Sequence, residues 1–121
     1  MQDEKKKILT KDQILQAKDA RMEEVKVPEW EGSVFVRSLT GRERDQLEAE
    51  ILQTPGKKNM ENLRSKLIAL SAVDEKGNRL FELKDAVALG EKNARALDRI
   101  FAVAQRLSGL TAKDMEELTK N

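Results

Sequence analysis

The sequence predicts a mainly helical α+β fold, a compact bundle of about five or six short helices with one small N-terminal β-hairpin. Three observations support this prediction. A helix-start signal recurs three times, apolar residues recur every three or four positions after residue 40, and residues 24–38 alternate between polar and apolar. With 121 residues, of which 39% are apolar, the chain is long enough to bury one core. We therefore expect a single domain over residues 1–121, with a frayed segment at 1–8, the hairpin at 24–38 and a helical part at 40–118.

The recurring helix-start signal is a Leu-Thr pair followed, three residues after the Thr, by a side chain that can accept a hydrogen bond. Such a capping box satisfies backbone N–H groups that the first turn of a helix leaves unpaired. The signal occurs at Thr10 with Gln13, at Thr40 with Glu43 and at Thr111 with Asp114. It predicts that three helices begin immediately after these threonines.

Apolar spacing and stop signals predict how far each helix extends. We expect helices at about 11–20, 41–53, from 59 through Ala72, and at 83–89, 93–107 and 112–118. In the first, Ile14 and Leu15 form the apolar face. In the third, Leu63, Leu67 and Leu70 recur at helical spacing together with Met60, which indicates a central, well-buried helix.

The hairpin is predicted by two runs of β-branched residues on either side of a loop that contains Pro28 and Gly32. Period-two alternation places Val25 and Val27 on the same face as Val34 and Val36, toward the core. Pro28 cannot donate to a strand ladder, so it suits the end of a strand. Residues 79–81 are a further candidate for a short extended segment.

The residue types argue against an enzyme. The chain has no His and no Cys, so catalytic arrangements that pair Ser or Cys with His are impossible, as are thiolate and imidazole metal sites. Its glycines are scattered and form no phosphate-binding loop. We expect no catalysis, no metal and no cofactor. A net charge of +1 with interleaved signs also argues against a nucleic-acid partner, and no apolar run suits a membrane.

Two features are candidates for binding another protein. Trp30 is the only tryptophan and lies in the predicted hairpin loop, where it is either an anchor for a partner or a lid on the core. The terminal helix offers Leu110, Met115 and Leu118, which either contact a partner or dock on their own domain. Both alternatives stay open for each feature at this point.

Taken from end to end, the chain resembles the tail assembly chaperones of long-tailed bacteriophages (siphoviruses) and related prophages. The resemblance spans about residues 8–118 and depends on the order of several segments. These are ILTKDQIL (Ile8–Leu15), VKVPEWEG (Val25–Gly32), VRSLTGRERD (Val36–Asp45), LSAVDEKGNRLF (Leu70–Phe81), and ALDRIF (Ala96–Phe101) followed by LSGL (Leu107–Leu110).

The resemblance implies a protein that binds the tape measure protein, a very long and largely helical chain, and keeps it soluble until tail-tube subunits displace the chaperone. It implies action in the host bacterial cytoplasm, absence from the mature virion and a possible homo-oligomer. It provides no catalytic residues and does not fix the binding surface. We expect the tape measure protein to bind the C-terminal helix through Leu110, Met115 and Leu118, with Trp30 as a second candidate. The alternatives are another small phage assembly factor, such as a scaffold or connector component, or a small DNA-binding regulator.

Overall fold

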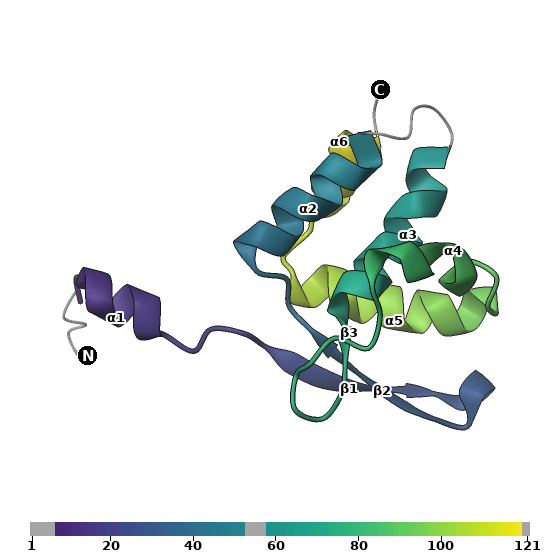
Figure 1. The fold of residues 1–121 in the computed structure, drawn as a ribbon, viewed down its shortest axis with the longest axis horizontal. Coiled ribbons are helices and arrows are strands. Elements are labelled where there is room, and N and C mark those ends of the chain that lie inside the picture. Colours follow the sequence, from purple (N-terminus) through teal and green to yellow (C-terminus); the bar gives the residue numbers. More distant parts are fainter. Residues whose placement is uncertain (1–6, 53–57, 120–121) are drawn as a thin grey trace, which may run out of the picture.

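A computed structural model describes residues 7–52 and 58–119 (Figure 1). Within these ranges the α-helices are α1 (Lys11–Gln16), α2 (Gly41–Leu52), α3 (Lys58–Ser71), α4 (Ala86–Leu89), α5 (Ala94–Leu107) and α6 (Ala112–Thr119). The strands are β1 (Met22–Val27), β2 (Gly32–Arg37) and β3 (Ala72–Val73), and the short 3₁₀ turns are η1 (Pro28–Trp30) and η2 (Leu83–Asp85). The predicted mainly helical α+β fold is confirmed. Most of the segment expected to be frayed, residues 1–8, lies outside the described residues.

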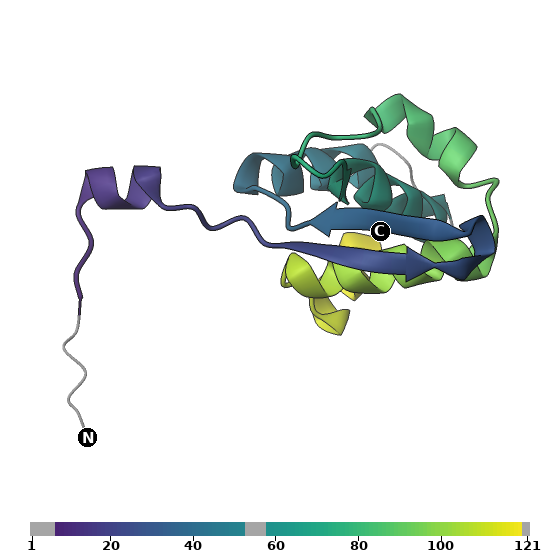
Figure 2. The same ribbon diagram turned by 90° about the horizontal axis from the view of Figure 1, so that it is seen from below.

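The predicted hairpin is formed by β1 and β2, which pair antiparallel with Val25 opposite Val34. Val25, Val27 and Val36 are buried, and the half-buried Val34 packs against the same core, as the alternation predicted. Helix α5 packs against both strands, on the face that these valines share (Figure 2). The hairpin thus closes one side of the core.

The third strand was not predicted, and the expectation that Ala72 extends the third helix is wrong. Helix α3 ends at Ser71, and Ala72 then pairs with Val36 across the antiparallel contact between β2 and β3. The turn that follows β3 explains why the chain leaves the helix here. The carboxylate of Asp74 accepts hydrogen bonds from two backbone N–H groups of that turn, and Gly77 adopts a φ of 88°. The chain thereby returns beside β3, where Arg79 bridges Val73.

Helix α1 is shorter than expected, because it ends at Gln16 and Ala17 is extended. The expected apolar face is not buried: Ile14 is 57% and Leu15 is 72% exposed. Figures 1 and 2 show α1 standing apart from the rest of the fold, at the end of an extended connection to β1.

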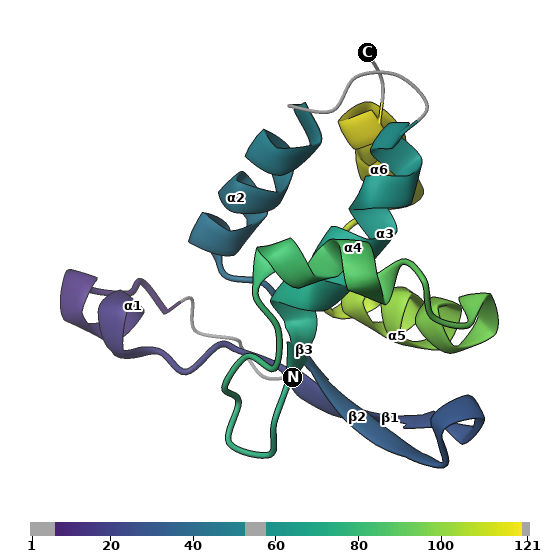
Figure 3. The same ribbon diagram turned by 45° about the vertical axis from the view of Figure 1, so that its right-hand side comes forward.

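The core lies around α3, which contacts α2, α4, α5 and α6 (Figure 3). Its fully buried large side chains come from the hairpin, from α2, from α3 with the adjoining β3, and from α5, namely Val27, Val36, Leu47, Ile51, Leu63, Leu67, Ile68, Leu70, Val73 and Ile100. The central position predicted for the third helix is confirmed, although the side chain of Met60 lies outside the described part.

All three predicted capping boxes are present, each with two reciprocal hydrogen bonds of 2.9–3.2 Å. They occur at Thr10 with Gln13, Thr40 with Glu43 and Thr111 with Asp114. Short local signals therefore fix where α1, α2 and α6 begin.

Candidate partner-binding surface

Trp30 is carried by the 3₁₀ turn that joins the two strands of the hairpin. Pro28 begins this turn, and its carbonyl accepts a hydrogen bond from the backbone N–H of Glu31 at 3.0 Å. Glu31 adopts a left-handed conformation with φ of 55°, which is unusual for a residue other than glycine. The turn is thus tightly closed, and it fixes the direction in which Trp30 leaves the hairpin.

A second contact holds this turn against α5. Arg99 donates two hydrogen bonds to the carboxylate of Glu29, at 2.8 and 3.0 Å. These hydrogen bonds stabilise the charged carboxylate and so lower the pKa of Glu29 below its usual value of 4.5. Because Glu29 directly precedes Trp30, the ion pair positions the indole ring relative to the helices.

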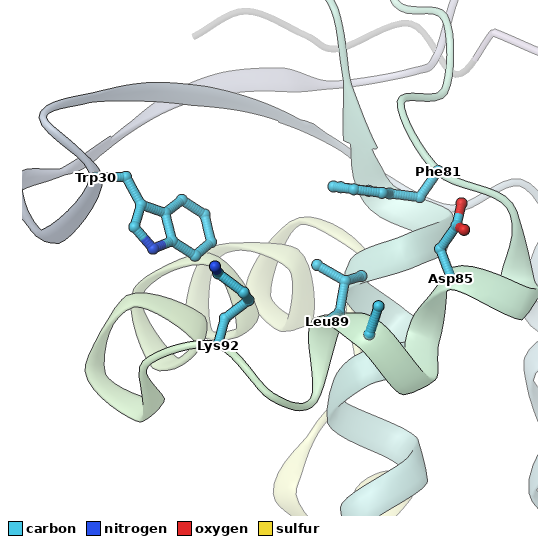
Figure 4. A pocket seen from close by; sticks show the side chains of 6 residues that line it. Trp30, Phe81, Asp85, Leu89 and Lys92 are labelled. Atoms are coloured by element: carbon cyan, nitrogen blue, oxygen red, sulfur yellow. The ribbon is translucent and has the colours of Figure 1, made fainter.

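Trp30 forms one wall of an open pocket of about 580 Å³, which we call the Trp30 pocket. Its lining residues come from the hairpin turn and from the segment 81–92, and are Trp30, Phe81, Asp85, Ala88, Leu89 and Lys92. Figure 4 shows the ring of Phe81 above Leu89 and the ring of Trp30 across the pocket from both. A pocket that is mostly apolar and open to solvent is suited to an apolar side chain of another molecule.

Two charged residues mark the rim of the Trp30 pocket. Asp85 is held in place because its carboxylate accepts a hydrogen bond from the backbone N–H of Glu82 at 2.8 Å. Lys92 follows α4 and extends its ammonium group toward the indole of Trp30 (Figure 4). The rim therefore offers one negative and one positive charge around an apolar floor.

The other candidates lie elsewhere. Leu110 is 4% and Met115 is 7% exposed, and both belong to the core, where α6 packs against α2 and α3. Leu118 is half-buried and lines a smaller hollow of about 270 Å³ between α6 and α2. Figure 1 shows α6 at the top of the helical part and the hairpin turn at the lower right, and the two hollows share no lining residue, so the structure does not unite Trp30 with the terminal helix.

Sequence reasoning missed most of the Trp30 pocket. Only Trp30 itself was named, because Phe81, Leu89 and Lys92 come near it only through the tertiary fold. One signal was available in the sequence. The chain has only three phenylalanines and one tryptophan, so each aromatic residue outside the apolar face of a predicted helix was a candidate for binding a partner.

Within residues 7–52 and 58–119, no group of three or more acidic, His or Cys side chains is arranged to hold a metal ion. In the same ranges, no helix has the length and apolar character needed to cross a membrane.

Comparison with solved structures gives a match to the "Structure of bacteriophage HK97 tail assembly chaperone". The TM-score is 0.59, the sequence identity is 22%, and the match covers 79% of this chain and 94% of the HK97 chain. No protein-family model and no curated protein matches the sequence. The chain therefore has the fold of a bacteriophage tail assembly chaperone, in agreement with the resemblance found in its sequence.

Proposed function

We propose that this protein is a phage tail assembly chaperone that binds the tape measure protein through the Trp30 pocket. The observation that carries the proposal is the shared fold with the HK97 chaperone, which extends over 94% of that chain. The open pocket supports it, because it presents apolar surface that the domain itself does not cover.

The pocket suits a helical partner. An amphipathic helix binds by inserting apolar side chains, three or four positions apart, into an apolar groove. Trp30, Phe81 and Leu89 provide the groove, and its volume of about 580 Å³ is within the range of about 300–1,000 Å³ typical of binding sites. Asp85 and Lys92 at the rim would meet charged residues that flank the apolar stripe of the helix.

The function would be to cover apolar stripes of the long tape measure chain in the bacterial cytoplasm, because exposed stripes of that size cause aggregation. A single small pocket binds weakly, whereas many copies along one chain gain avidity. Weak individual contacts also suit displacement by tail-tube subunits, after which the chaperone would be absent from the virion. In this proposal Leu118 is a secondary contact, and Leu110 and Met115 act by anchoring α6.

Co-expression with the tape measure protein tests the proposal. The wild-type chain should co-purify with that protein and raise its soluble fraction. Ala88→Glu places a charge in the Trp30 pocket and should abolish both effects. Val87→Glu is the matched control, because Val87 is the neighbouring residue on α4, is 79% exposed and does not line the pocket.

The outcomes separate the two parts of the proposal. If the wild-type chain neither co-purifies with the tape measure protein nor keeps it soluble, the chaperone function is wrong. If Ala88→Glu acts like the wild type, the function stands and the Trp30 pocket is not its site.

A further inference from the structure

Residues 7–16, which we call the N-terminal arm, expose apolar side chains that nothing in the described part of the domain covers. The four large apolar residues of the arm are all exposed, with Ile8 at 77%, Leu9 at 50%, Ile14 at 57% and Leu15 at 72%. A helix of six residues, such as α1, is marginal by itself. A cluster of exposed apolar side chains is typical of an interaction site, so we expect the arm to dock on a surface.

The sheet offers such a surface on the face that points away from the helices. Figure 1 shows helices α2 to α6 on one side of the hairpin. Glu24 pairs with Phe35, which in turn pairs with Val73 on the third strand. Val25 and Val36, the next residues along β1 and β2, are buried in the core. Since successive side chains of a strand point to opposite faces, the row from Glu24 to Val73 lies on the other face, which we call the outer face.

A hollow of about 590 Å³ lies on this side of the sheet, and we call it the outer-face hollow. Its apolar lining includes Phe35, Val73 and Leu80, and Leu80 is 51% exposed. The charged part of its lining is acidic overall, with two carboxylates and one ammonium group, from Asp74, Glu75 and Lys76. The outer-face hollow shares no lining residue with the Trp30 pocket. It is therefore a second place where apolar side chains can bind.

The N-terminal arm carries the opposite charge. Its charged residues are Lys7, Lys11 and Asp12, so the arm is basic overall. The rim of the Trp30 pocket has one positive and one negative charge and gives no such preference. Because complementary charge selects between surfaces of similar apolar character, it favours the outer-face hollow for the arm.

The connection to β1 is long enough for the arm to reach this hollow in its own chain. Arg21 is fixed beside Ser38, because its N–H donates to the Ser38 hydroxyl at 3.0 Å and its carbonyl accepts from the Ser38 N–H at 2.8 Å. Residues 17–20 are therefore the hinge. An extended chain from Leu15 to Arg21 spans about 20 Å. Val73 lies three residues along β1 and two strands across from Arg21, a separation of about 14 Å.

We propose that the N-terminal arm folds back onto the outer face of its own sheet and places Ile14 and Leu15 in the outer-face hollow, beside Phe35 and Leu80. Figure 1 shows the arm extended, which is the open state, and the docked arm is the closed state. Closing covers apolar residues of both the arm and the sheet, which lowers the tendency of the free chain to aggregate. The contact lies outside the Trp30 pocket, so it does not depend on the proposed function.

An internal disulfide tests the contact, since the chain contains no cysteine of its own. Gln16→Cys places a thiol at the end of α1 and Ser33→Cys places one in the lining of the hollow, and both residues are exposed. In a glutathione redox buffer at high dilution, this double variant should form the internal disulfide. Adding Ile14→Gln and Leu15→Gln should lower the effective concentration of the two thiols about tenfold or more, because burial of these side chains is lost. An unchanged effective concentration would overturn the proposal.

Two further cysteine pairings separate this site from other acceptors. A chain with Gln16→Cys and Ala88→Cys carries its second thiol in the Trp30 pocket. A mixture of a Gln16→Cys chain with a Ser33→Cys chain reports docking on a second copy. Both should form much less disulfide than the double variant with Gln16→Cys and Ser33→Cys at the same dilution. An equal yield from either pairing would show that the arm docks elsewhere and that the proposal is wrong.

Charge reversal in the hollow tests the complementarity. Glu75→Lys makes the charged lining basic overall and should lower the disulfide yield at low salt, whereas Lys76→Glu makes it more acidic and should raise the yield. Both side chains are exposed, so neither change should disturb the fold. Equal yields from the two variants, or yields in the reverse order, would contradict docking of the basic arm in this hollow.

Discussion

Arg99 on α5 binds the carboxylate of Glu29 through two hydrogen bonds, which join the hairpin turn to the helix beneath it. The two residues are 70 positions apart in the sequence, so this contact is purely tertiary. The planar guanidinium fixes the carboxylate in both position and orientation. Trp30, the next residue, is thereby held at the wall of its pocket.

Arg99→Met should weaken partner binding while changing the melting temperature little. Both side chains are partly exposed, and ion pairs of this kind contribute little to stability. The loss should therefore appear in binding, because the turn no longer holds Trp30 in place. Arg95→Met is the control, since it removes a positive charge from the same helix without removing these hydrogen bonds. Equal binding by the two variants would contradict the positioning role of Arg99.

Glu43→Gln should lower the free energy of unfolding by about 1.5–3 kcal/mol, the range for hydrogen bonds to charged groups. Glu43 is buried, and its Oε2 lies 2.6 Å from the Arg37 guanidinium and 3.0 Å from that of Arg79. The amide that replaces this carboxylate lacks the negative charge that both arginines need. Urea unfolding measures this loss of stability. An unaltered midpoint would show that the ion pairs of Glu43 with Arg37 and Arg79 do not hold β2, α2 and the segment after β3 together.

The same carboxylate predicts a pH dependence. Burial alone raises the pKa of Glu43, but the Thr40 backbone N–H, Arg79 and Arg37 outweigh burial and lower it below the ordinary value of 4.5. Because the folded-state pKa is depressed, the stabilisation is present above 4.5 and is lost as the pH falls through the folded-state pKa. The stability gap between the wild type and Glu43→Gln should therefore narrow at acidic pH. A gap that stays constant would show that Glu43 does not titrate as described.

Helix α6 supplies another test. Met115→Ala should lower the free energy of unfolding by about 2–5 kcal/mol, as is usual when a buried Met is truncated. Leu118→Ala should cost less, because Leu118 is only half-buried, yet it should weaken partner binding if α6 is the secondary contact. Thermal unfolding and co-purification of both variants separate the two roles. A Met115→Ala protein that is as stable as the wild type would mean that α6 does not pack against α2 and α3.

The elements that the sequence predicted well are those with local causes. The three capping boxes depend on residues three positions apart, and the buried valines of the hairpin depend on period-two alternation. Strand β3 could not be predicted in this way. Ala72 fits a helix face as well as a strand, and only its pairing with Val36 decides between them.

The candidate site was predicted only in part, for a similar reason. Trp30 was recognisable from its residue type and its loop, but its pocket needs Phe81 and Leu89, which lie far along the chain and come near it only in the folded state. The terminal helix had a thin apolar face, and from sequence alone this face suited a partner and its own core equally. Leu110 and Met115 are both buried, and α6, which carries Met115, packs against α2 and α3, a packing that no local pattern reveals.

The central claim, that the Trp30 pocket receives a helix of the tape measure protein, is tested most directly by the fluorescence of Trp30. Since Trp30 is the only tryptophan, its emission reports on this pocket, provided that the tape measure segment used contains none. Titration with that segment should shift the emission to shorter wavelength and saturate, because the bound helix removes water from the indole. Binding that is detected by co-purification but leaves the emission of Trp30 unchanged would contradict the claim.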